Sequence, residues 1–197
     1  MVHLDFMRLT QLKNMRHPTL MMVCLGIWLL GVGCNRHEET TACPVCGVAN
    51  WIIFSPAGER FSVLMPTKPT ESTTMADTRV GQVPVYYFTA RPLKEHSFAV
   101  THSTYPQGVD ITDAEKLFNK IEYMTLTTGA QLISKTNITL HGIPGRELIY
   151  EKEDHVVSLR IYLIDRDVYQ AMSAMPKESN CQKHIHEFLE SFQIKQK

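Results

Sequence analysis

Val156-Val-Ser-Leu-Arg-Ile-Tyr-Leu-Ile164 is the strongest strand pattern in the sequence. Apolar side chains recur at every second position, so one face of this segment is continuously apolar, as expected for a β-strand. These side chains belong to Val157, Leu159, Ile161 and Leu163. After Asp165-Arg-Asp167, residues 168–175 form a second strand pattern. The sequence therefore predicts an antiparallel hairpin of two long strands.

Further strand patterns precede this hairpin, and Gly, Pro and Ser residues separate them. They cover residues 51–54, 60–65, 73–79, 83–89, 96–102, 131–140 and 145–151. We expect the first four to form two hairpins. Gly142 and Gly145 flank Pro144 in a predicted tight turn.

Two helices are predicted among the strands. Thr112-Asp-Ala-Glu115 is a capping box for a helix that ends near Gly129, and Ser179-Asn-Cys-Gln182 is a second capping box near the end of the chain. The C-terminal helix has an apolar face made of Cys181, Ile185, Phe188, Leu189 and Phe192. This order predicts an α+β fold, a mainly antiparallel sheet with a central and a C-terminal helix packed on it.

The N-terminal part of the sequence resembles an export signal. Residues 20–33 form an uncharged apolar run, preceded by Arg8, Lys13 and Arg16. The run is shorter than the roughly 20 residues of a membrane-spanning helix. We therefore expect a signal peptide at residues 1–33, a polar tether at 34–50 and one globular domain at 51–197. Either Met1 or Met15 could be the start of translation.

Gly31-Val-Gly-Cys34 resembles the lipobox of bacterial lipoproteins, in which the cysteine is lipidated and becomes the mature N-terminus. Val32 and Gly33 match the small residues of that motif, whereas Gly31 replaces its usual leucine. The resemblance implies a palmitate-bearing lipid on Cys34, attachment to a membrane and an extracytoplasmic domain in the cell envelope. An ordinary signal peptide with a coincidental cysteine, or an uncleaved anchor, would be the alternative.

Composition excludes one class of partner. Residues 1–33 hold three of the 20 Lys and Arg residues and one of the 20 Asp and Glu residues, so the remaining chain has 17 against 19 and a formal charge of −2. A nucleic-acid-binding protein would show a clustered basic excess. We therefore expect no nucleic acid among the partners.

The cysteines after Cys34 suggest three different chemistries. Cys43-Pro-Val-Cys46 followed by Gly resembles half of a zinc ribbon, and Cys181-x-x-His184 could supply the two further ligands of a tetrahedral site. Exported thiols usually form disulfides instead, although three cysteines leave one unpaired. A disulfide, a zinc site and free thiols all remain open at this point.

Three further motifs resemble a known family. They are Phe61-x-Val63-x-x-Pro66-x-x-Pro69, Gly142-x-Pro144-Gly145-Arg146-Glu147 and Phe188-Leu-x-Ser191-Phe192. They are similar to bacterial envelope proteins with a PsbP-like α/β/α sandwich, over roughly residues 52–193. The resemblance implies that fold. It transfers no activity, because the metal-handling residues of the photosynthetic members, which assist photosystem II, have no counterpart here.

Arg146 and Glu147 should point to opposite faces of their strand. We expect Arg146 to pair with an acid such as Asp165 or to bind an anionic ligand. Neither a His-Glu-x-x-His motif nor a Gly-x-Ser-x-Gly motif occurs, so no catalytic residue is predicted. The expected function is a non-catalytic binding or assembly-assisting module for an envelope protein or small ligand, without a cofactor. The alternative is a thiol/disulfide or zinc-binding protein that uses Cys43 and Cys46.

Overall fold

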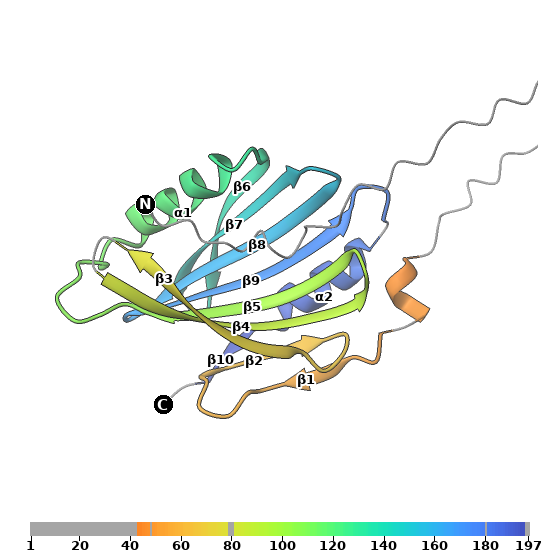
Figure 1. Ribbon diagram of the computed structural model, residues 1–197, viewed down its shortest axis with the longest axis horizontal. Coiled ribbons are helices and arrows are strands. Elements are labelled where there is room, and N and C mark those ends of the chain that lie inside the picture. Colours follow the sequence, from red (N-terminus) through yellow and green to blue (C-terminus); the bar gives the residue numbers. More distant parts are fainter. Residues whose placement is uncertain (1–42, 48, 79–80, 180, 196–197) are drawn as a thin grey trace, which may run out of the picture.

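A computed structural model of the chain describes residues 43–47, 49–78, 81–179 and 181–195. Figure 1 shows a large twisted sheet with a helix on either side and a small sheet beside it. The small sheet contains β1 (Ile52–Phe54), β2 (Phe61–Met65) and β10 (Gln193–Ile194). The large sheet contains β3 (Thr70–Thr78), β4 (Gly81–Leu93), β5 (His96–Thr104), β6 (Gln131–Leu140), β7 (Ile143–Lys152), β8 (His155–Ile164) and β9 (Asp167–Pro176). The helices are α1 (Ala114–Leu126) and α2 (Gln182–Glu190).

The seven strands of the large sheet lie in the order β3-β4-β5-β9-β8-β7-β6, and every neighbouring pair is antiparallel. The β8–β9 hairpin lies inside this sheet, with Val157 opposite Ala174 and Leu163 opposite Val168. The β1–β2 and β3–β4 hairpins also form. The mainly antiparallel α+β fold predicted from the sequence is therefore confirmed.

Alternation along the strands of the large sheet creates two separate cores. The apolar face of β8 packs with Leu117 and Phe118 of α1. On the opposite face, Tyr162 and Ile164 of the same strand pack with α2 and the small sheet. The two helices therefore lie on opposite faces of the sheet, which gives three layers.

An arginine on each face of the large sheet binds acidic side chains of the covering helix. Arg146 of β7 reaches Glu115 of α1 at 2.6 Å. Arg160 of β8 reaches Glu190 of α2 at 2.6 Å and Glu147 of β7 at 2.7 Å. Glu147 thus lies on the face opposite to Arg146, as the strand pattern predicted.

The helix starts differ from the predicted capping boxes. Asp113, one residue after Thr112, is the N-cap of α1 and accepts a hydrogen bond from the Lys116 N–H at 3.0 Å. The box at Ser179 is wrong, because Cys181 is the N-cap of α2 and its side chain makes no capping hydrogen bond. The Ser179 hydroxyl lies 3.0 Å from His96 Nε2 instead.

The β6–β7 hairpin assigns different roles to two glycines. His141 and Gly142 form the turn, both with positive φ, and Gly142 adopts that conformation readily because it has no Cβ atom. Gly145 lies within β7 rather than in the turn. A Cβ atom there would lie 2.6 Å from the Tyr162 ring, so Gly145 allows this ring to pack directly on the backbone.

The folded region begins before the predicted domain boundary at Trp51. Val45, in the 3₁₀ helix η2 (Pro44–Gly47), is fully buried in the core beside α2. The Asn50 N–H donates to the Pro66 carbonyl at 2.7 Å, so the chain just before β1 is bonded to the residue that follows β2. Residues 43–47, 49 and 50 of the predicted tether therefore belong to the domain. Among the described residues, no helix has the length and hydropathy needed to cross a membrane.

Candidate functional site

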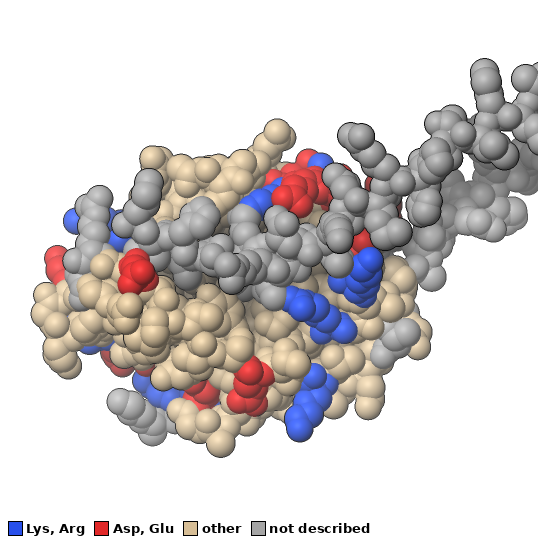
Figure 2. Space-filling view, in the orientation of Figure 1, with Lys and Arg blue, Asp and Glu red and all other residues tan. Residues whose placement is uncertain are grey.

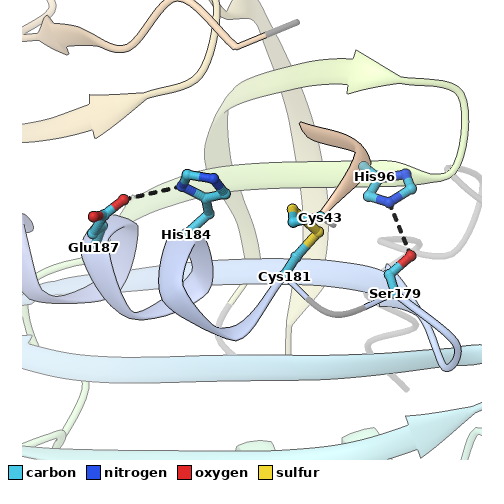
Figure 3. Close-up of a disulfide and its surroundings, with 6 residues drawn as sticks. All are labelled: Cys43, His96, Ser179, Cys181, His184 and Glu187. Atoms are coloured by element: carbon cyan, nitrogen blue, oxygen red, sulfur yellow. Dashed lines mark hydrogen bonds and ion pairs between the residues drawn. A yellow bond between two sulfur atoms is a disulfide. The ribbon is translucent and has the colours of Figure 1, made fainter. Parts of the chain in front are cut away.

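A disulfide bond between Cys43 and Cys181 joins the start of the described chain to the N-terminus of α2 (Figure 3). The two residues are 138 positions apart, and their Cα atoms lie 4.8 Å from each other. Cys181 is fully buried, in agreement with its place on the apolar face of the helix, whereas Cys43 is partly exposed. Sequence spacing alone left three pairings of these cysteines open.

Two of the four predicted zinc ligands, Cys43 and Cys181, form this disulfide. The third, Cys46, lies in η2, and its side chain is outside the described part of the structure. The fourth, His184, stacks on Trp51 with ring centroids 5.4 Å apart, and its Nδ1 lies 3.0 Å from Glu187. Within the described residues, no group of three or more His, Cys, Asp or Glu side chains is arranged to hold a metal ion.

His96 lies on the other side of the disulfide in Figure 3 and helps to hold the turn that precedes Cys181. Its Nε2 lies 3.0 Å from the Ser179 hydroxyl, and its Nδ1 is buried with no hydrogen-bond partner among the described residues. Burial lowers the pKa of His96 below its ordinary value of 6.5, with nearby His155 acting in the same direction and Glu95 opposing it. The fold therefore favours the neutral imidazole.

This preference makes stability depend on pH. Because the pKa of His96 is lower in the folded than in the unfolded state, its contribution is complete above about pH 6.5 and is lost as the pH falls through the folded value. We expect the urea midpoint to decrease between pH 7.5 and pH 5, and His96→Gln to flatten that decrease. The amide of Gln can still reach Ser179, but it does not titrate.

His141→Gln is the matched control, because His141 is exposed in a turn and bonds Gln193 at 2.6 Å. It should leave most of the pH dependence in place. Equal slopes for wild type and His96→Gln would contradict the assignment to His96.

Arg146 is the most deeply buried charged residue described, with a side chain only 3% exposed. Its guanidinium donates to Glu115 at 2.6 Å, to Asn137 at 2.7 Å and to Glu122 at 3.5 Å. The predicted partner Asp165 is wrong, since that carboxylate lies 3.8 Å from Arg60. The arrangement joins α1 to the sheet, and the carboxylates occupy the positions that an anionic ligand would need.

A polar cluster around His102 was not predicted from the sequence. The two ring nitrogens of His102 face different carboxylates, with Nδ1 2.7 Å from Glu59 and Nε2 3.3 Å from Asp167. The ring also stacks on Tyr169 with centroids 4.5 Å apart. These residues come from the loop before β2, from β5 and from β9, so no local motif connects them. The cluster links the β1–β2 region to the large sheet.

The remaining sites lie elsewhere. Cys34 is outside the described residues, and so is the apolar run at residues 20–33. On the face shown in Figure 2, acidic and basic side chains of the described residues are intermixed rather than gathered into one basic patch. Apart from the buried arginines, the candidate site consists of the Cys43–Cys181 disulfide with His96 and His184 beside it.

Comparison with known proteins supports the fold. No protein-family model matches the chain, and no curated protein matches its sequence. The solution structure of cyanobacterial PsbP (CyanoP) from Synechocystis sp. PCC 6803 matches with a TM-score of 0.54 and 12% identity, over 79% of this chain and 98% of that chain. A crystal structure of a protein of unknown function from Pseudomonas aeruginosa matches with a TM-score of 0.37 and 14% identity. The match covers 68% of this chain and 88% of that chain. The match to CyanoP shows that the chain has a PsbP-like fold.

Proposed function

We propose that this chain is an envelope lipoprotein whose PsbP-like domain is held at a membrane by a lipid on Cys34 and acts as a non-catalytic binding or assembly-assisting module. The observation that carries the proposal furthest is the Cys43–Cys181 disulfide. Disulfides persist in oxidising, extracytoplasmic compartments. This agrees with the signal-like residues 1–33 and with the lipobox-like residues that end at Cys34.

The disulfide also limits how far the domain can move from the membrane. Nine positions separate Cys34 from Cys43, where the chain is fixed to α2. An extended chain of this length spans at most about 30 Å. The tether of the proposed lipoprotein is therefore about half as long as residues 34–50 alone would suggest, and the domain works close to the lipid surface.

The charged clusters support a rigid framework for the proposed module. Arg146 and Arg160 are both engaged by carboxylates of this chain, and the Arg160 guanidinium lowers the pKa of the Glu190 carboxyl group. Such pairs orient helices on a sheet. We propose that the domain contributes a rigid surface for an envelope protein or small ligand.

The test is acylation of the full chain, expressed in a bacterial host with its own signal. We expect wild type to incorporate alkyne-labelled palmitate. Its mass should be that of a lipidated chain that begins at Cys34. Cys34→Ala should incorporate no label and should not be cut at that position. Cys24→Ala is the matched control, because Cys24 lies within the apolar run, and it should be labelled like wild type. An unlabelled wild type, or equal labelling of Cys34→Ala, would refute the lipid anchor.

A further inference from the structure

We propose that two copies of this chain pair edge to edge through β6 and form a two-fold dimer. β6 and β3 are the end strands of the large sheet (Figure 1), and among the described residues β6 has only β7 as a neighbour. Eight of its ten residues are exposed and none is buried. The backbone N–H and C=O groups on its outer side can therefore pair with a further strand. The inference concerns the sheet and does not depend on the lipid at Cys34.

Exposed apolar side chains occur at this edge. Ile133 and Leu132 of β6 and Tyr123 of α1 are three of the six large apolar residues that are exposed in the described part of the chain. A register shift of β6 against β7 leaves Ile133 without an opposite residue. Tyr123 follows Glu122, whose carboxylate binds Lys135 of β6 at 3.0 Å. A long edge with exposed apolar side chains is a site of strand pairing.

Charge favours self-pairing of β6 over self-pairing of β3. β3 has two exposed acidic residues, and an antiparallel pair of β3 strands over their full length would place Glu71 of one copy opposite Asp77 of the other. Like charges that lie directly opposite each other destabilise a sheet. The only charged residue of β6 is Lys135, and Glu122 of the same chain balances its charge.

The β6–β7 hairpin determines which backbone groups of β6 point outward. Its two-residue turn makes Leu140 and Ile143 a hydrogen-bonded pair. Along an antiparallel ladder, hydrogen-bonded pairs alternate with pairs that have no hydrogen bond. The N–H and C=O groups of Thr139, Asn137 and Lys135 therefore point away from β7, towards a second copy.

One register pairs these groups and also covers Ile133. It places Thr136 opposite Thr136 of the second copy, on the two-fold axis, and Lys135 opposite Asn137. Ile133 then lies opposite Thr139 of the second copy. A register centred on Lys135 would put two ammonium groups opposite each other. A register centred on Asn137 would leave Ile133 beyond the paired strand.

This pairing is closed, because both copies use the same strand around a two-fold axis. The free edges of the joined sheets are then the two β3 strands, whose acidic residues oppose further pairing. Assembly should therefore stop at two copies.

Disulfide trapping tests the register. The full chain with Thr136→Cys is expressed in a bacterial host, oxidised in the lysate with copper phenanthroline and analysed on a non-reducing gel. In a pair without hydrogen bonds the Cα atoms lie about 4.5 Å apart, which a disulfide can span. We expect a covalent dimer at least tenfold more abundant than in Thr74→Cys. Thr74 is the matched control, because it is an exposed threonine in the middle of β3. Wild type gives the background from the cysteines already present.

A charge at the edge provides a second measurement. Ile133→Lys and Met75→Lys are each added to Thr136→Cys, and the two original side chains are both 54% exposed, on opposite edges of the sheet. A lysine on an edge strand opposes pairing. Ile133→Lys should lower the dimer yield at least fivefold, and Met75→Lys should leave it unchanged. Limited proteolysis of the monomer checks that each variant is folded.

Three results would overturn the dimer. The first is equal cross-linking of Thr136→Cys and Thr74→Cys. The second is an adduct of Thr136→Cys with host proteins alone, which would assign the edge of β6 to a foreign partner. The third is an equal loss of dimer in the Ile133→Lys and Met75→Lys variants. A chain that cross-links as expected but carries no lipid would refute only the anchor.

Discussion

Replacing both disulfide cysteines, as Cys43→Ser with Cys181→Ala, should lower the free energy of unfolding by about 3–5 kcal/mol. Removal of a native disulfide typically costs about 2–5 kcal/mol, and the cost in chain entropy grows with the loop that the bond closes. Here the bonded residues are 138 positions apart, which places the effect in the upper part of that range. For a domain of this size the melting temperature should decrease by about 10 °C.

The measurement is urea unfolding of the full chain under non-reducing conditions, followed by far-ultraviolet circular dichroism. Cys46→Ser is the control because it also removes a cysteine but leaves the Cys43–Cys181 bond intact, and it should lose less stability than the double variant. Alanine suits position 181 because the side chain there is fully buried in an apolar cluster. An oxidised wild type and a double variant with the same midpoint would contradict a stabilising role for the bond.

Arg146→Ala should lower the free energy of unfolding by about 2–3 kcal/mol, since it removes a buried side chain together with its hydrogen bonds and packing. Glu122, whose side chain is 13% exposed, would keep only Lys135 as a partner, and Asn137 Oδ1 would lose the donor that Arg146 supplies at 2.7 Å. The stacking of the guanidinium 5.7 Å above the Phe118 ring is also lost. We therefore expect α1 to detach from the large sheet before the sheet itself unfolds.

Lys135→Ala provides the matched control for this prediction. Lys135 binds the same Glu122 at 3.0 Å, but its side chain is 43% exposed. Exposed ion pairs contribute about 0–1 kcal/mol, so this variant should stay close to wild type. Chemical unfolding together with hydrogen exchange of the α1 amides measures both effects. Equal losses in the two variants would show that burial does not determine the strength of the cluster.

Elements with strong local patterns were predictable from the sequence. The β8–β9 hairpin formed as expected, because alternation over eight or more residues buries one face and therefore fixes the register. The α2 face was also predicted, and Ile185, Phe188 and Leu189 are buried as its spacing required. β10 was missed, because two residues carry no periodic signal and pair only after β2 is in place.

Prediction of the candidate site was limited to the identity of its residues. The sequence singled out Cys43, Cys46, Cys181 and His184, but it did not indicate which cysteines would pair. The serine expected to cap α2 contacts His96 instead, 83 positions away. Arg146 was recognised as an ion-pair residue, yet its partner proved to be on α1 rather than in the β8–β9 turn.

The sequence by itself determined the periodic elements, the antiparallel fold class and the residues available for thiol and ion-pair chemistry. Those properties depend on side chains a few positions apart, whose geometry is set by the local backbone. Only the tertiary structure decided that Cys43 bonds Cys181, that Arg146 bonds Glu115 and that His102 lies between Glu59 and Asp167. Each of these contacts joins residues from different elements, and packing of the layers around the two cores brings them within reach.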